Sequence, residues 1–232
     1  MTSTLWRRFD SFVRTLDGFE DIDALLKNRT DLHGKKRADY LFQGRQIIVE
    51  QKRLVSNPIY RPQGFAAKTR RDRRIVVYGT VSTRSIFSAQ PDADALQRKI
   101  ILDLAKRISA DVADADKQTR DTRLIFDIPD AVGIIVLLNE GAEILTPDVI
   151  GYAVSNAFQE RSNEGARRYT HSDGVIGISE AQTLPVQALP TYPINTFTSP
   201  QTNRAEIVVA FSDMLISKWA TFNHATLNIQ EE

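Results

Sequence analysis

Two runs decide the fold: Arg-Ala-Asp-Tyr-Leu-Phe at residues 37–42 and Ile-Ile-Val-Glu-Gln-Lys at residues 47–52. Each run contains a short apolar segment, and the connection between them contains Gly44. This pattern is typical of a β-hairpin, in which opposed residues lie on the same face of the two strands. With the turn at Gly44 and the residue after it, Asp39 faces Glu50 across the hairpin. A shift of one residue in the loop would turn Asp39 to another face.

The opposed acids predict more than a structural hairpin. Two carboxylates side by side in a sheet repel each other, so a purely structural strand pair does not favour them. A divalent cation between them would remove this repulsion, because hard cations prefer oxygen ligands. Lys52 lies two residues after Glu50, hence on the same face, where it could hold an anion or polarise a water molecule. The alternative is a surface hairpin whose charges simply alternate.

The charges are unevenly distributed along the chain. The 232 residues include 30 Lys and Arg against 29 Asp and Glu, a net charge of +1. Residues 35–74 alone carry a net charge of +9, which leaves −8 for the remainder. Such asymmetry predicts a polyanionic partner, and the alternative is a solvated surface. We assign contact with a phosphate backbone to Lys68, Arg70, Arg71, Arg73 and Arg74.

Composition excludes several classes of function. The chain has no cysteine, which excludes disulfides, thiolate zinc sites and a cysteine nucleophile, and favours a cytoplasmic location. Hydrophobic residues make up 42% and charged residues 25%, as in ordinary globular proteins. No apolar run is long enough to span a membrane. We therefore expect a globular protein with no membrane partner.

The rest of the sequence predicts alternating helices and strands. The expected helices span about 4–17, 20–28, 93–117, 147–160 and 203–223. The further expected strands span about 75–81, 124–128, 134–138 and 175–178, with an irregular, proline-rich connection at 183–200. Alternation of this kind indicates an α/β or α+β fold with a mixed sheet. We expect one domain over 1–232, with a core at about 4–140 and a C-terminal strand and helix extension at about 141–232.

The hairpin residues resemble the motif of a known enzyme family. Residues 37–42 and 47–52 are similar to the core of the PD-(D/E)XK nuclease superfamily, which has the restriction-endonuclease-like fold. That pattern consists of an acidic helix, an aspartate on one strand, and Glu-x-Lys closing the next. Ala38 stands where the nominal motif has proline, a departure that many members share. The resemblance implies a mixed central sheet flanked by helices, with the order α–β–β–β–α–β.

The resemblance also implies an activity and a set of roles. Members of the superfamily are Mg²⁺-dependent nucleases that hydrolyse phosphodiester bonds, mostly in DNA, and Mn²⁺ can replace Mg²⁺. Asp39, Glu50 and the main-chain carbonyl of Gln51 would bind the metal. Lys52 would orient the attacking water or stabilise developing negative charge, and Glu20 would be the helix acid that assists the metal. Three other acids compete with Glu20 for that role: Asp10, Asp17 and Asp23.

Two other functions remain open from the sequence. The first is a catalytically inactive nucleic-acid-binding module of the same fold that acts within a larger complex. The second is an α/β protein whose basic block meets an acidic protein partner. Among nucleic acids we expect DNA rather than RNA, with endonucleolytic cutting. A homodimer is one way to cut both strands, because a single active site cuts one.

Overall fold

A computed structural model of the chain describes residues 4–32, 34–54, 93–143, 145–181, 184–186 and 189–227. Its centre is an open, mixed sheet of six strands in the order β1-β2-β3-β4-β5-β8. The strands are β1 Glu20–Asp21, β2 Tyr40–Phe42, β3 Ile47–Leu54, β4 Val132–Asn139, β5 Gly174–Ser179 and β8 Ile194–Thr198. The three central strands β3, β4 and β5 are parallel, and the flanking pairs are antiparallel. A separate two-stranded ribbon consists of β6 Leu184–Val186 and β7 Leu189–Thr191.

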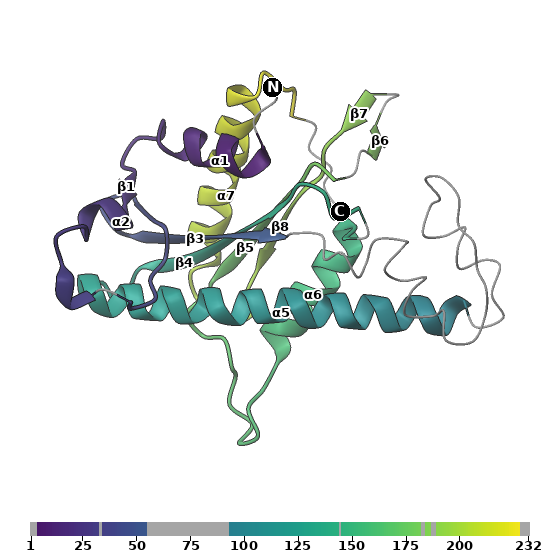
Figure 1. The fold of residues 1–232 in the computed structure, drawn as a ribbon, viewed down its shortest axis with the longest axis horizontal. Helices are drawn as coiled ribbons and strands as arrows, with labels where there is room; N and C mark the ends of the chain where they lie inside the picture. The colour runs from purple at the N-terminus through teal and green to yellow at the C-terminus, as the bar shows by residue number, and fades with distance from the viewer. Residues whose placement is uncertain are drawn as a thin grey trace.

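Helices cover both faces of the sheet (Figure 1). They are α1 Leu5–Val13, α2 Ile22–Leu25, the 3-10 helix η1 Thr30–Leu32, α5 Ala93–Phe126, α6 Pro147–Gln159 and α7 Ala205–Phe222. Capping residues determine where several of these helices begin. The side chain of Thr4 accepts a hydrogen bond from the Arg7 N–H at the start of α1. Thr146 caps α6 in the same way, ahead of Pro147, which suits the first turn of a helix.

The core lies in two layers, one on each side of the sheet. Helices α1 and α7 pack on one face through Phe9, Phe12 and Phe211, which are buried against β2, β3, β4 and β5. On the other face, α5 and α6 pack against β4 and β5. All eight residues of β4 are buried, as expected for a central parallel strand with helices on both sides. The protein therefore has an α/β architecture of three layers.

The close approach of α5 to the sheet depends on a glycine in β4. A Cβ on Gly133 would lie 2.1 Å from the carbonyl oxygen of His171 and 2.6 Å from Cγ2 of Thr119 on α5. No side chain fits in this space. Gly133 therefore lets α5 and the segment before β5 approach the same point of β4.

The structure confirms much of the predicted order of elements. The hairpin register is as predicted, with Tyr40 paired to Val49, Leu41 to Ile48 and Phe42 to Ile47. The strand expected at 134–138 and the one expected at 175–178 are present as β4 and β5. The helices expected at 147–160 and 203–223 are present as α6 and α7. The expected α/β class with a mixed sheet is confirmed.

Four expectations are wrong, two of them because pairing with a distant strand overrides a local pattern. The segment 20–28 starts as strand β1, since Glu20 and Asp21 pair with β2. The segment 124–128 is no strand: α5 continues to Phe126 and ends where Asp127 takes a φ of 54°. The connection 183–200 contains three short strands, one of which, β8, joins the main sheet. The first helix also ends at Val13, before the expected residue.

The strand expected at 75–81 lies outside the described residues. No helix in the described ranges is long and apolar enough to cross a membrane.

Candidate functional site

The carboxylates of Asp39 and Glu50 meet at the open end of the β2–β3 hairpin. The confirmed register carries them to opposed positions on one face, and the charge of Asp39 acts on the pKa of Glu50. Just before β2, the N–H of Asp39 donates to the carbonyl of Val49 (3.2 Å). One carboxylate oxygen of Asp39 accepts a hydrogen bond from the N–H of Gln51 (2.7 Å). The backbone thus fixes Asp39 beside Glu50.

Glu50 is a buried acid whose hydrogen bonding is incomplete. The residue is 2% exposed, and its Oε2 has no hydrogen-bond partner among the described residues. Burial, and then the nearby charge of Asp39, raise the pKa of Glu50 to about 8. Burial also raises the pKa of Asp39, although the Gln51 N–H opposes this effect. A buried polar atom without a partner costs free energy, so this pair favours binding either a proton or a cation.

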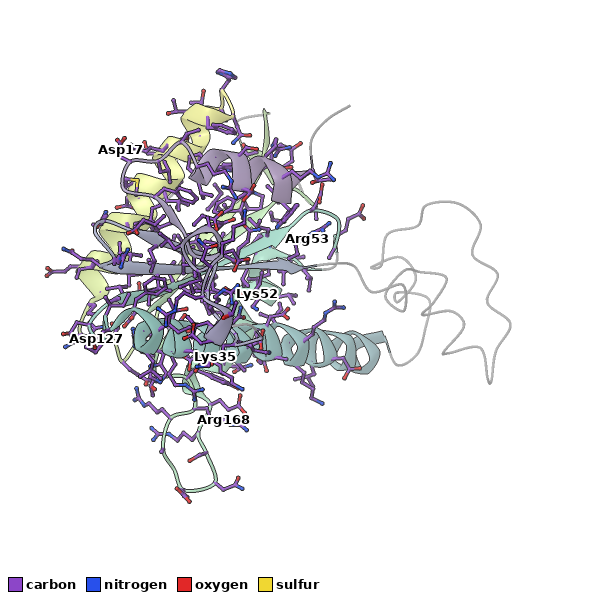
Figure 2. The ribbon with its side chains drawn as sticks, turned by 60° about the vertical axis from the view of Figure 1, so that its left-hand side comes forward. Asp17, Lys35, Lys52, Arg53, Asp127 and Arg168 are labelled. Atoms are coloured by element: carbon purple, nitrogen blue, oxygen red, sulfur yellow. The ribbon has the colours of Figure 1, made fainter. Side chains whose placement is uncertain are left out.

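Lys52 places a positive charge against the two acids. Its Nζ lies 2.9 Å from Oε1 of Glu50 and 2.9 Å from Oδ2 of Asp114 on α5. Figure 2 shows Lys52 in the space between the sheet and α5. Burial lowers the pKa of Lys52, but the hydrogen bonds and charges of Glu50 and Asp114 outweigh it and raise the pKa above its usual value. Lys52 is therefore held as an ammonium ion.

Helix α5 completes the site with polar residues that the sequence analysis did not identify. Besides Asp114, the side-chain oxygen of Gln118 accepts a hydrogen bond from Lys52 (2.5 Å). The amide nitrogen of Gln118 donates to the carbonyl of Arg37 (2.7 Å), just before β2. Asp111 lies one turn earlier, and burial raises its pKa while the charges of Arg107 and Lys52 lower it. Residues 111, 114 and 118 are spaced so that they lie on one face of a helix, and this spacing could have identified them from the sequence.

The main-chain carbonyl of Gln51 lies on the strand edge that faces Asp39. In an extended strand, the N–H and C=O of one residue lie on the same edge. Since the N–H of Gln51 donates to Asp39, the carbonyl of Gln51 lies on that edge too. β2 begins at Tyr40, one residue after Asp39, so no residue of β2 pairs with Gln51. The role of this carbonyl as a third oxygen ligand stays a prediction.

Glu20 is not a helix acid, which corrects the expectation. It lies in β1, and its carboxylate forms an ion pair with Arg45 (2.8 Å), toward the closed end of the hairpin. Of the three competing acids, Asp23 in the first turn of α2 is the one whose charge acts on Asp39, although its effect is the smallest of those on that group. Its charge raises the pKa of Asp39, and it forms an ion pair with Arg37 (2.7 Å). Asp23 therefore replaces Glu20 as the nearby acid.

The two remaining competitors have other surroundings. Asp10 accepts a hydrogen bond from the hydroxyl of Tyr40 (3.0 Å), on the α1 side of the sheet. Asp17 is exposed near Lys218 of α7 (3.9 Å), and Figure 2 labels it far from Lys52. Neither lies on the face that carries Lys52.

Ion pairs neutralise much of the described part of the basic block at 35–74. Of the six basic residues that the structure describes in this block, five have an acidic partner. The pairs are Lys36–Asp114, Arg37–Asp23, Arg45–Glu20, Lys52–Glu50 and Arg53–Glu140. The predicted phosphate contacts Lys68, Arg70, Arg71, Arg73 and Arg74 lie outside the described residues and stay a prediction.

The residues present suit a hard divalent cation of the Mg²⁺ type. The unpaired Oε2 of Glu50, the adjacent carboxylate of Asp39 and the carbonyl of Gln51 are all oxygen donors. Across the described ranges, no group of three or more His, Asp or Glu residues is placed to hold a metal. Mg²⁺ nevertheless binds proteins through one or two carboxylates together with water and substrate phosphate. Two carboxylates and a carbonyl fit that pattern.

A second buried polar cluster has a structural explanation. Asp173 accepts hydrogen bonds from the N–H of Gly133 (2.9 Å), the hydroxyl of Thr202 (2.6 Å) and Arg123 (3.2 Å). Arg123 also donates to the carbonyl of Ala131 (3.0 Å). These contacts join α5, the start of β4 and the segment before α7. Because its partners are satisfied within the fold, we assign the cluster to stability.

No protein-family model matches the chain, and neither a curated protein nor a solved structure matches it.

Proposed function

We propose that the chain is a metal-dependent nuclease that hydrolyses phosphodiester bonds, an endonuclease acting on DNA. The single observation that carries the proposal is the geometry of Glu50. This acid is 2% exposed, contacts Asp39 and Lys52, and keeps one oxygen without a hydrogen-bond partner among the described residues. A site that is incomplete on its own and rich in oxygen donors favours an added cation.

The burial argues against the alternative of a surface hairpin with alternating charges. Surface charges are solvated and cost little, whereas Glu50 is desolvated beside a second carboxylate. Raised carboxylate pKa values next to a specific charged partner are typical of functional sites. Lys52, 2.9 Å away, supplies that partner.

The order of elements also supports a restriction-endonuclease-like core. Among the described helices and strands, the order is α1, β1, β2, β3, α5, β4, with the short α2 inserted after β1. This is the order α–β–β–β–α–β that the resemblance implies, although the first strand is β1 at 20–21 and was not expected. Asp39 directly precedes β2, and Glu50 and Lys52 lie on β3. The same hairpin thus presents the whole motif.

The roles of the chain's own groups follow from this geometry. Asp39, Glu50 and the Gln51 carbonyl would hold Mg²⁺ or Mn²⁺. When bound, the ion would activate a water molecule and neutralise charge on the scissile phosphate. Lys52 stays protonated, because Glu50 and Asp114 raise its pKa. It therefore donates hydrogen bonds to negative charge and does not act as a general base.

Asp114 and Gln118 are positioning residues in this proposal. Each contacts the ammonium group of Lys52, Asp114 at 2.9 Å, and neither contacts Asp39 or Glu50 through a hydrogen bond given by the structure. Gln118 also ties the segment before Asp39 to α5 through the Arg37 carbonyl. They would hold Lys52 and the start of β2 in a fixed relation.

Cleavage in the presence of Mg²⁺ or Mn²⁺ tests the proposal. Supercoiled plasmid, linear duplex, single-stranded DNA and RNA are incubated with the wild-type chain and with Glu50→Gln. We expect cleavage of DNA that EDTA stops and that Glu50→Gln abolishes. Glu206→Gln, an acid in the first turn of α7 on the opposite side of the sheet, is the matched control and should cut like the wild type.

The results also separate the other functions. DNA binding without cleavage of any substrate by any metal would point to an inactive binding module of the same fold. No salt-dependent retention of nucleic acid would leave the acidic-protein partner as the better proposal. Gel filtration with and without duplex DNA tests the proposed homodimer.

A further inference from the structure

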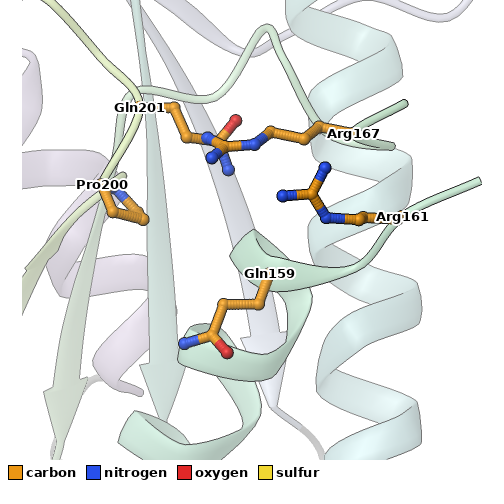
Figure 3. Close-up of a pocket in the computed structure, with 5 residues that line it drawn as sticks. All are labelled: Gln159, Arg161, Arg167, Pro200 and Gln201. Carbon is orange, nitrogen blue, oxygen red and sulfur yellow. The ribbon is translucent and has the colours of Figure 1, made fainter. Parts of the chain in front are cut away.

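A pocket of about 210 Å³ opens where α6 ends and a hairpin turns back toward β5. Figure 3 shows the five residues that line it, from two separate parts of the chain. They are Gln159, Arg161, Arg167, Pro200 and Gln201. The hairpin extends away from the sheet, past α5 (Figure 1). Figure 2 labels its Arg168 on the far side of α5 from Lys52, so this pocket is separate from the Asp39–Glu50–Lys52 site.

Two arginines are opposed across the neck of this hairpin. Arg161 and Arg167 form an antiparallel bridge, which places their side chains on the same side. Figure 3 shows both guanidinium groups pointing into the pocket. Like charges at directly opposed positions destabilise a strand pair. An anion between the two groups would turn this repulsion into attraction.

No carboxylate neutralises this pair in the described part of the chain, where the ion pairs do not include Arg161 or Arg167. The next residue, Arg168, provides the contrast, because it forms an ion pair with Glu160. Glu160 also accepts a hydrogen bond from the hydroxyl of Tyr169 (3.0 Å). Glu160 is thus already engaged, and the described ion pairs do not join Glu164, the acid between the two arginines, to either of them, so both positive charges remain available to the pocket.

The pocket is held in shape before any ligand binds. Arg161 donates to the carbonyl of Gly165 (3.0 Å), whose φ of 79° closes the hairpin. The amide nitrogen of Gln201 donates to the carbonyl of Phe158 (2.7 Å), which joins the two walls. Arg161 uses one of its five N–H donors in this contact, so most donors remain for a ligand. Preorganised donors lower the entropic cost of binding.

We propose that this pocket binds one phosphate group of a nucleic-acid strand, at a position away from the scissile bond. The inference rests on the proposed nuclease function for the identity of the ligand. A phosphodiester carries one negative charge shared by two non-bridging oxygens, each of which can accept hydrogen bonds from a guanidinium, and arginine forks match this geometry. The side-chain amides of Gln159 and Gln201 add neutral donors at the same opening. Contacts to phosphate position a strand without reading its sequence.

Binding in EDTA tests this site without any need for cleavage. Fluorescence anisotropy measures the affinity of the full chain for a labelled duplex and for a labelled single strand over a series of salt concentrations. We expect Arg161→Ala/Arg167→Ala to weaken binding roughly 10- to 100-fold. If one phosphate is lost, the slope of log K against log salt falls by about 0.9 for duplex or about 0.7 for single strands.

Two further variants distinguish binding at this pocket from general electrostatic attraction to the protein surface. Arg7→Ala/Lys218→Ala removes the same number of positive charges from α1 and α7, on the opposite face, and should change affinity far less. Arg161→Lys/Arg167→Lys keeps the charge but loses the fork geometry, so it should keep the salt slope and lose part of the affinity. Circular dichroism of each variant verifies that the fold is intact.

Three results would overturn the proposal. The first is an unchanged affinity and salt slope for the double alanine variant. The second is an equal loss in the variant of the opposite face, which would show general electrostatic attraction. The third comes from titration of inorganic phosphate by calorimetry: if the double variant loses phosphate binding but keeps nucleic-acid binding, the ligand is a free phosphate compound. Failure of the nuclease proposal would show separately, as binding without metal-dependent cleavage.

Discussion

Lys52 and Asp114 form an ion pair of 2.9 Å that joins strand β3 to helix α5, although 62 positions separate them in the sequence. The same ammonium group lies 2.9 Å from Glu50. One lysine thus connects the buried acid of the hairpin to the helix that crosses it. This arrangement gives Lys52 a fixed position, a retained proton and a direct contact to the proposed metal ligand.

Removal of Lys52 should therefore slow cleavage strongly while DNA binding persists. We expect Lys52→Ala to lower kcat about 100- to 1,000-fold, the usual cost of losing one preorganised donor to developing negative charge. The matched control is Lys36→Ala, since Lys36 also pairs with Asp114 but is exposed and does not contact Glu50. Single-turnover rates at saturating DNA measure the effect. Equal losses in both variants would mean that Lys52 contributes charge alone.

Loss of Asp114 should produce a smaller and different defect. In Asp114→Asn the ammonium group of Lys52 loses one of the two carboxylates that raise its pKa. We expect a rate about tenfold lower, as for other residues that support an active-site group, and an alkaline limb of the pH–rate profile that moves to lower pH. Asp121→Asn, on the same helix and paired with Arg120, is the control. A lower rate with an unmoved alkaline limb contradicts the positioning role.

The raised pKa of Glu50 makes the stability of the metal-free protein depend on pH. Its pKa is about 8 in the fold and 4.5 in an ordinary environment, so the folded state binds the proton more tightly than the unfolded state. The stabilisation is complete below pH 4.5 and disappears as pH rises through about 8. Between these values the free energy of unfolding should fall by up to about 1.4 kcal/mol per pH unit.

The comparison with Glu50→Gln isolates this effect, because all other titrating groups are common to both proteins. Urea unfolding in EDTA at pH 5 to 9 should give a wild-type curve that falls relative to the variant. The variant should also be the more stable protein at the alkaline end, since it lacks the buried charge. Parallel curves across the range would show that Glu50 titrates normally.

The sequence predicted the hairpin part of the site because that part is local. A turn residue, two apolar runs and a period of two set the register that places Asp39 opposite Glu50. The face of Lys52 follows from the same period. These features need no knowledge of the remainder of the chain.

The contribution of α5 could not be predicted in the same way. Asp114 and Gln118 meet Lys52 only because α5 crosses the sheet at a particular height and rotation, which depends on packing around Gly133 and Thr119. The two-residue strand that contains Glu20 is likewise defined by its pairing with β2. Local propensity favours a helix there, and the tertiary contact overrides it. A charge count along the chain is incomplete for a similar reason, since acids distant in sequence, such as Asp114 and Glu140, pair with described members of the basic block.

The buried cluster around Asp173 should be sensitive to loss of charge. Asp173→Asn removes the carboxylate that pairs with Arg123, which stays buried and unpaired. We expect the free energy of unfolding to fall by about 3–5 kcal/mol, the usual cost of breaking a buried ion pair. Asp130→Asn removes an exposed partner of Arg204 and should cause no measurable change. Chemical denaturation of both variants decides between a structural cluster and a dispensable one.

The glycine in β4 tests how α5 is placed over the site. In Gly133→Ala the new methyl group would lie 2.1 Å from the carbonyl oxygen of His171 and 2.6 Å from Thr119, so backbone or helix must move. We expect a loss of about 3 kcal/mol or more, at the upper end of the cost of overpacking. Gly141→Ala is the control, because nothing lies within 4 Å of its Cβ position. If Gly133→Ala keeps its stability but cleaves slowly, α5 has shifted relative to Lys52. Thr119→Ser, which removes the α5 methyl group 2.6 Å from the new Cβ, should then restore part of the cleavage rate.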